Sequence, residues 1–178
     1  MNLPNILSLF RLFLTFFFIV LIVRHQLGWA LLLFVLQALS DLLDGFFARR
    51  MGTKTTLGTY LDPLADKVML AGSYVVLCLQ DIVPLWLFLV VILRDVVIAL
   101  GFLALLKIGR TMGPVPSLLS KTTTVLQMVT IIYVLYSKGR PFDYAFFYVT
   151  ALFTIASGCQ YMFLGWSAFL KKEPEKTV

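Results

Sequence analysis

Four aspartates stand at the edges of two strongly apolar stretches, where carboxylates are rare. Asp41 and Asp44 close the first stretch, and Asp62 and Asp66 open the second, within the run SDLLDGFFARRMGTKTTLGTYLDPLADK. An ionised carboxylate near hydrocarbon costs about 2.5–3.5 kcal/mol on insertion scales, and four close together also repel one another. A pair of hard divalent cations would gather them, because Mg²⁺ and similar ions prefer carboxylate oxygens and water. The pattern therefore predicts a membrane enzyme.

The spacing places the two aspartates of each pair on one helix face. Asp41 and Asp44 are three residues apart, and Asp62 and Asp66 are four apart. An antiparallel helical hairpin would bring both pairs to one depth. Pro63 suits the first turn of a helix, so a helix start at Gly58 or at Asp62 is left open.

Clustered carboxylates beside an arginine favour phosphoryl-type chemistry. Two bridged cations can neutralise a diphosphate and stabilise the leaving phosphate. One carboxylate can serve as general base for an attacking hydroxyl. The alternative is a salt-bridge cluster of the four aspartates with Arg49 and Lys67, which leaves surplus negative charge in a low-dielectric setting.

The composition is that of an integral membrane protein. Of 178 residues, 60% are hydrophobic and 13% charged, and the mean hydropathy is +0.93. Soluble domains are about 45–50% apolar, and a chain this short buries too little surface to be soluble with this composition. With one histidine, His25, and two distant cysteines, Cys78 and Cys159, neither a histidine-based site nor a zinc site is expected. No nucleic-acid partner is expected either.

The apolar stretches predict the fold class, because a helix needs about 20 apolar residues to cross a bilayer. We expect an all-α integral membrane protein, a six-transmembrane-helix bundle formed by residues 1–170, with a short basic tail at 171–178. The first stretch contains Arg11 and lacks a small-residue cleavage site, so we expect it to stay in the mature protein. The six predicted spans are about 6–23, 28–47, 60–80, 84–106, 120–136 and 144–169.

Lysines and arginines are distributed unevenly between the two sides of such a bundle. Eight would lie on one side and three on the other, which makes the first side cytoplasmic. Both termini and the aspartate cluster would then face the cytoplasm, in a bacterial inner membrane or its equivalent. The eight are Arg49, Arg50, Lys54, Lys107, Arg110, Lys171, Lys172 and Lys176, and the three are Arg24, Lys138 and Arg140.

Polar residues interrupt the first apolar stretch at a helical interval. Asn5, Ser8 and Arg11 are three residues apart and share one helix face. One interpretation is an interfacial anchor helix with a snorkelling arginine. The other is that this face looks into the active-site cavity.

The aspartate region resembles the full signature of the CDP-alcohol phosphatidyltransferases. Its pattern, D-x2-D-G-x2-A-R-x8-G-x3-D-x3-D, fixes eight residues over 26 positions and is highly specific. The matching residues are Asp41, Asp44, Gly45, Ala48, Arg49, Gly58, Asp62 and Asp66.

The resemblance implies a reaction and a site. Family members bind a CDP-linked lipid, transfer its phosphatidyl group to an alcohol and release CMP, typically as homodimers with Mg²⁺ or Mn²⁺. By match, Asp41, Asp44 and Asp62 would bind two divalent ions. Asp66 would be the general base for the acceptor hydroxyl and a further metal ligand. The residues expected to line the CDP site are Gly45, Ala48, Arg49 and Gly58.

Two further segments bear on the acceptor alcohol. Arg94-Asp95 and the run from Ser120 to Thr124 are similar to eukaryotic-type cardiolipin synthases, which use phosphatidylglycerol. Phosphatidylglycerophosphate synthases, which use glycerol 3-phosphate, usually carry Arg-Glu and a second lysine where this chain has Thr123. The resemblance therefore favours cardiolipin synthase, with glycerol 3-phosphate as the alternative acceptor. The residues expected to contact an acceptor or lipid phosphate are Arg94, Lys121, Arg110, Asn5 and Arg11.

Two other classes of membrane protein fit this sequence less well. Intramembrane prenyltransferases also bind diphosphates through Mg²⁺, but they need more helices than 178 residues allow. A cation transporter would not place Arg49 and Arg50 beside its carboxylates, since they would repel the cation.

Overall fold

The computed structural model describes the chain at residues 3–51, 56–107, 117–137 and 143–170, and it describes side chains at 10–40, 65–101, 103–104, 117–137 and 144–167. Within these residues it has six helices and no strand, as predicted. The tail at 171–178 and Arg110 lie outside them. The helices are α1 Leu3–Val23, α2 Leu27–Met51, α3 Thr56–Leu79, α4 Leu85–Lys107, α5 Leu118–Ser137 and α6 Asp143–Leu170.

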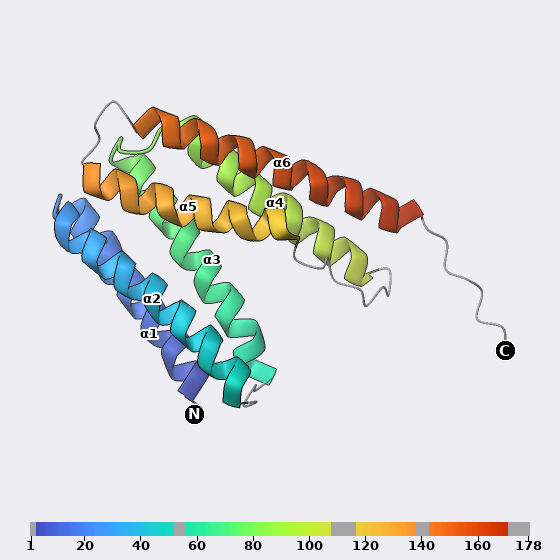
Figure 1. Ribbon diagram of the computed structural model, residues 1–178, viewed down its shortest axis with the longest axis horizontal. Helices are drawn as coiled ribbons and strands as arrows, with labels where there is room; N and C mark the ends of the chain where they lie inside the picture. The colour runs from blue at the N-terminus through green and yellow to red at the C-terminus, as the bar shows by residue number, and fades with distance from the viewer. Residues whose placement is uncertain (1–2, 52–55, 108–116, 138–142, 171–178) are drawn as a thin grey trace.

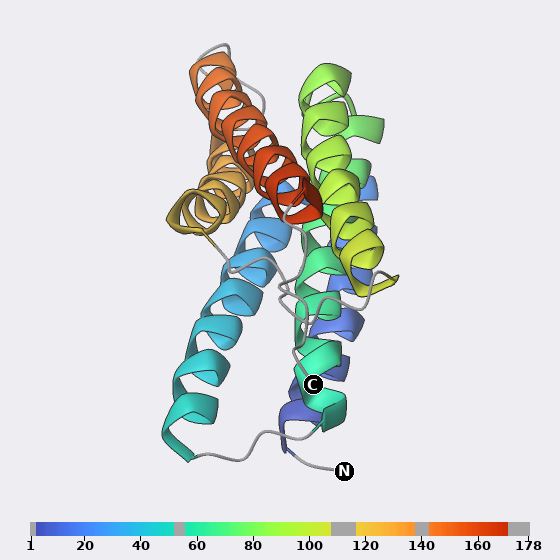
Figure 2. The same cartoon turned by 90° about the vertical axis from the view of Figure 1, so that its right-hand side faces the viewer.

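The helices form two groups of three (Figure 1). In the described part of the chain, α1 packs against both α2 and α3, which do not pack directly on each other. In the second group, α4 and α5 pack against α6. The groups meet where α2 and α3 contact α5 and where α3 contacts α4. In Figure 2, α5 and α6 lie at the upper end of α2, and α4 lies on the opposite side of the view. Figure 1 shows α2 and α3 running in opposite directions, and the hairpin that would bring the two aspartate pairs to one depth stays a prediction, because the side chains of residues 41–64 are outside the described set.

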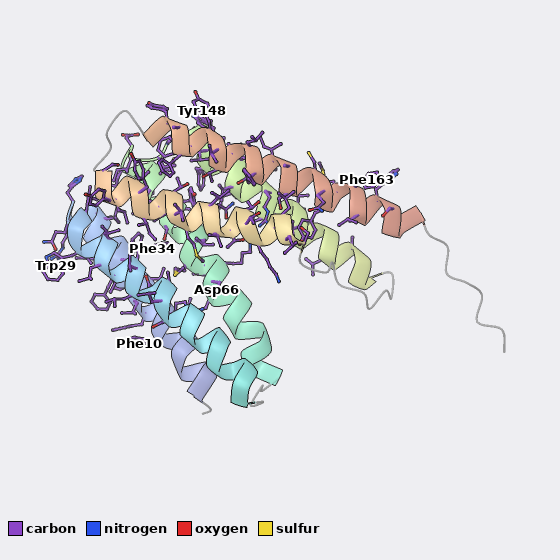
Figure 3. The ribbon with its side chains drawn as sticks, viewed as in Figure 1. Phe10, Trp29, Phe34, Asp66, Tyr148 and Phe163 are labelled. Carbon is purple, nitrogen blue, oxygen red and sulfur yellow. The ribbon has the colours of Figure 1, made fainter. Side chains whose placement is uncertain are left out.

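Large apolar side chains occupy both the core and the outer surface. Phe18 and Phe34 are fully buried, with ring centroids 5.6 Å apart. Trp29, Tyr148 and Phe163 are each more than 60% exposed and project outward in Figure 3. Exposed apolar area of this extent is unfavourable in water and suits a lipid environment.

Two helical segments in the described part of the chain are long and apolar enough to cross a membrane on their own. They are Leu118–Ser137 and Tyr144–Ser167. Two shorter apolar helical stretches are Phe10–Val23 and Leu27–Ser40. The crossing of all six helices stays a prediction.

Hydroxyl and amide groups join α5 to α6 inside the second group. The hydroxyls of Thr130 and Thr150 lie 2.5 Å apart, and Gln127 Nε2 donates to Thr154 Oγ1 at 3.3 Å. Tyr74 of α3 donates to the Gln127 carbonyl at 3.2 Å, which ties the first group to this interface. Such bonds replace water as the partner of polar groups in hydrocarbon.

Replacing Thr130 with Val should therefore weaken the bundle by about 0.6 kcal/mol, the average found for interhelical side-chain bonds in membranes. The free energy of unfolding in mixed detergent micelles measures it. Thr122→Val is the matched control, because the exposed Thr122 hydroxyl bonds only to the Leu119 carbonyl of its own helix. An equal loss in both variants would contradict the role of the Thr130 bond.

Candidate active site

The buried face of α2 continues into the segment that carries two of the aspartates. Ala30, Phe34 and Gln37 are all fully buried and recur at helical spacing. The same repeat places positions 41 and 44 next on that face of the continuous helix. Continued at the same spacing, this repeat would direct both positions toward the interior of the first group, which stays a prediction because the described side chains of α2 end at position 40.

Asp66 is the one signature aspartate whose side chain the structure describes. It projects from the middle of α3 (Figure 3), is 33% exposed, and forms an ion pair with Arg11 of α1. α3 begins at Thr56, so Asp62 and Pro63 lie well inside the helix. Of the two starts that the sequence left open, the one at Gly58 is close to the observed start and the one at Asp62 is wrong.

Arg11 connects α1 to both neighbouring helices. Its side chain is only 4% exposed and reaches Asp66 of α3. Its backbone carbonyl accepts hydrogen bonds from Thr15 Oγ1 at 2.8 Å and from Gln37 Nε2 of α2 at 3.0 Å. Of the two interpretations of this face, the snorkelling arginine is therefore wrong, and Arg11 points inward at a signature aspartate.

Gln37 is a site residue that the sequence reasoning missed. Its Nε2 also donates to Thr15 Oγ1 at 3.0 Å, while its Oε1 is buried with no hydrogen-bond partner among the described residues. The signal was present, since Gln37 is a polar residue in an apolar run one helical turn before Asp41.

A second polar cluster joins four helices, and we call it the α4 charge cluster: Lys67, Arg94, Asp95, Ser120 and Ser157. Arg94 Nη1 donates to Asp95 Oδ1 at 2.6 Å. Arg94 Nη2 donates to Ser120 Oγ at 2.6 Å and to Ser157 Oγ at 3.2 Å. Lys67 Nζ lies 2.6 Å from the same Asp95 oxygen, so this lysine pairs with Asp95 of α4.

The pairing of two adjacent residues was not expected from helix geometry. Neighbouring residues point about 100° apart, and this argues against a shared partner for Arg94 and Asp95. The arginine side chain is long enough to fold back along the helix and reach its neighbour. Arg94 is nonetheless buried, and its Nε has no hydrogen-bond partner among the described residues.

Lys121 lies in the first turn of α5, beside Ser120. Ser117 caps this helix, because its Oγ accepts from the Ser120 N–H at 3.1 Å and its carbonyl accepts from the Lys121 N–H at 3.1 Å. The Lys121 side chain is exposed. Thr123 is instead fully buried, with its hydroxyl 3.1 Å from the Phe153 carbonyl of α6.

Several predicted site residues lie on described helices, but their side chains are outside the described set. Within the described side chains there is no group of three His, Cys, Asp or Glu residues that could hold a metal. Three of the four predicted metal ligands are outside that search, so the metal site stays a prediction. The side chains in question are those of Asn5, Asp41, Asp44, Ala48, Arg49 and Asp62, together with positions Gly45 and Gly58.

A comparison with known proteins identifies the family of this chain. The family model for CDP-alcohol phosphatidyltransferase matches residues 1–156. The chain therefore belongs to the CDP-alcohol phosphatidyltransferase family, and it is a membrane-associated transferase of phospholipid biosynthesis.

Similar proteins from three bacteria bear one name, CDP-diacylglycerol–glycerol-3-phosphate 3-phosphatidyltransferase. They come from Salmonella paratyphi A, Escherichia coli K12 and Shigella flexneri. Each is 33% identical over 171 residues, covering 90% of this chain and 93% of the relative. These names support the alternative acceptor, glycerol 3-phosphate, better than the phosphatidylglycerol that the sequence resemblance favoured.

Position 123 explains part of that difference. The sequence favoured phosphatidylglycerol partly because this chain has Thr123 where a second lysine would help hold the phosphate of glycerol 3-phosphate. In the structure Thr123 faces α6 and bonds to its backbone. Position 123 lies at the α5–α6 interface. An uncharged residue there is therefore weak evidence for phosphatidylglycerol over glycerol 3-phosphate.

Proposed function

We propose that this protein transfers the phosphatidyl group of CDP-diacylglycerol to glycerol 3-phosphate and releases CMP. The observation that carries the proposal is the 33% identity, over nearly all of both chains, to enzymes named for that reaction. The arrangement of Asp66, Arg11 and the α4 charge cluster supports it.

Asp66 would act as the base. The acceptor hydroxyl oxygen attacks the phosphorus of the phosphatidyl group, the bond from that phosphorus to the CMP oxygen breaks, and Asp66 accepts the hydroxyl proton. Arg11, which lies against Asp66, would orient its carboxylate toward the acceptor.

Asp41, Asp44, Asp62 and Asp66 would hold two divalent ions, Mg²⁺ or Mn²⁺. An all-carboxylate donor set fits these ions, because hard cations prefer oxygen ligands. Such ions neutralise a diphosphate and stabilise its leaving group. In this proposal Arg49, with Gly45, Ala48 and Gly58, lines the CDP side of the site.

The α4 charge cluster is suited to the acceptor's phosphate. Lys67 and Arg94 share one carboxylate, so the cluster keeps an excess positive charge. The buried Arg94 Nε lacks a partner among the described residues, and such a donor calls for an acceptor that a phosphate oxygen can supply. Lys121, one residue from Ser120, would add a third cation. Arg110, Asn5 and Arg11 are the other predicted contacts.

The membrane arrangement belongs to the same proposal. All six helices would cross the bilayer, with both termini and the aspartates on the cytoplasmic side, and the protein would form a homodimer. The uneven distribution of lysines and arginines supports the orientation.

The acceptor assay tests the proposal directly. Purified protein in mild detergent with Mg²⁺ or Mn²⁺ and CDP-diacylglycerol should release CMP with glycerol 3-phosphate and form phosphatidylglycerophosphate. With phosphatidylglycerol in its place we expect less than about one-tenth of that rate, because an interaction difference of 1.4 kcal/mol already gives tenfold. Cardiolipin formation with no product from glycerol 3-phosphate would overturn the assignment.

A further inference from the structure

Asp95 is the centre of the α4 charge cluster. One of its oxygens accepts from both Lys67 Nζ and Arg94 Nη1, each at 2.6 Å. Lys67 Nζ and Arg94 Nη1 therefore lie no further apart than twice that distance. The Asp95 carboxylate between them offsets their mutual repulsion. The Asp95 side chain is 16% exposed, so bulk water does little to replace this compensation.

The Arg94 guanidinium is oriented from three helices. Asp95 holds Nη1 from α4, while Ser120 of α5 and Ser157 of α6 hold Nη2. Gly158 of α6 lies beside the aliphatic stem of Arg94, and a Cβ at that position would make an ordinary van der Waals contact, 3.7 Å from Arg94 Cγ. Among the described side chains Asp95 is the only charged partner of Arg94, and charge-assisted bonds are about twice as strong as neutral ones.

This arrangement is costly unless it serves function. Charged residues inside apolar helices are unfavourable, and those that persist usually mark substrate sites. α4 is otherwise apolar around Arg94 and Asp95, with Leu93 and Val96 exposed on its outer surface. Packing alone would be served as well by uncharged residues.

We propose that Asp95 is a positioning residue for the acceptor: it fixes the Arg94 guanidinium so that the acceptor's phosphate meets a preformed site. The inference rests on the proposed function, in which Arg94 contacts that phosphate. Asp95 acts through Arg94 and does not touch the reacting atoms. Its loss should therefore change acceptor binding and leave the CDP-diacylglycerol side of the reaction in place.

The test is the KM of each substrate in Asp95→Asn. We expect the KM for glycerol 3-phosphate to rise about tenfold, the effect of one lost charge-assisted bond, and the KM for CDP-diacylglycerol to stay within twofold. Asp95→Glu keeps the charge on a side chain one methylene longer and should fall between wild type and Asp95→Asn. Asp81→Asn is the matched control, because Asp81 is exposed in the turn after α3 and its φ of 55° suits asparagine.

The outcomes separate this inference from other roles. A purely structural role would lower the melting temperature and raise both KM values together, and that result would overturn the proposal, as would an unchanged KM for glycerol 3-phosphate. Should Asp95→Asn fail to fold, Asp95→Glu decides alone, since a rise confined to the acceptor KM supports positioning and any other pattern opposes it. If the wild-type protein uses only phosphatidylglycerol, the proposed function fails. The KM for phosphatidylglycerol in Asp95→Asn and in the wild type then tests the positioning role separately.

Discussion

Replacing Asp66 with Asn should lower turnover by about 10³-fold while CDP-diacylglycerol still binds. Asparagine has nearly the same shape as aspartate but cannot accept the proton of the acceptor hydroxyl, and a positioned general base contributes 10²–10⁴-fold. Asp66 lies in the middle of α3, where it is partly exposed and contacts Arg11. The measurements are CMP release under saturating substrates and equilibrium binding of labelled CDP-diacylglycerol.

The binding measurement distinguishes a base from a residue that only holds substrate. Loss of CDP-diacylglycerol binding in Asp66→Asn would contradict the base assignment and leave Asp66 as a ligand of the substrate complex. Asp81→Asn makes the same chemical change about 20 Å further along the chain, at the helical rise of 1.5 Å per residue. It should keep full turnover.

The helices could be predicted from the sequence because length and hydropathy determine them locally. The predicted span 120–136 corresponds to α5, Leu118–Ser137, and 144–169 corresponds to α6, Asp143–Leu170. The start of α3 was harder, since Pro63 favours a first turn. The structure begins this helix at Thr56, so Pro63 lies seven residues past its start.

Contacts between helices could not be predicted in the same way. The bond from Gln37 to the Arg11 carbonyl and the ion pair of Lys67 with Asp95 join residues distant in sequence. Their formation depends on which helix lies next to which, and no spacing within one helix contains that information. The aromatic residues show the same limit, because Phe16 and Phe17 are exposed while the adjacent Phe18 is fully buried.

The preference for phosphatidylglycerol as acceptor rested on a comparison with the same limit. Residue types at 94–95 and 120–124 were compared without knowing where each side chain points. Thr123 faces α6, while Ser120, three residues earlier, contacts Arg94. Residues three apart share a helix face, so the residue type at 123 could not show whether that position serves packing or a phosphate, and the comparison across the segment did not separate the two roles.

Replacing Asp44 with Ala should weaken Mn²⁺ binding by about 100-fold or more and abolish CMP release with it. Two ions held by four carboxylates depend on each ligand, and even residues that only support a metal ligand typically change metal affinity 10–100-fold. Asp44 is the better residue to test, because it has no assigned role as base and position 44 continues the helical repeat of the buried residues Ala30, Phe34 and Gln37.

Mn²⁺ affinity can be followed by electron paramagnetic resonance without any turnover. Asp81→Ala, which removes an exposed carboxylate from the turn after α3, should leave that affinity unchanged. Equal Mn²⁺ affinity in wild type and Asp44→Ala would show that the aspartates are gathered by cations of the protein itself, and the Arg11–Asp66 pair would then be the first such contact.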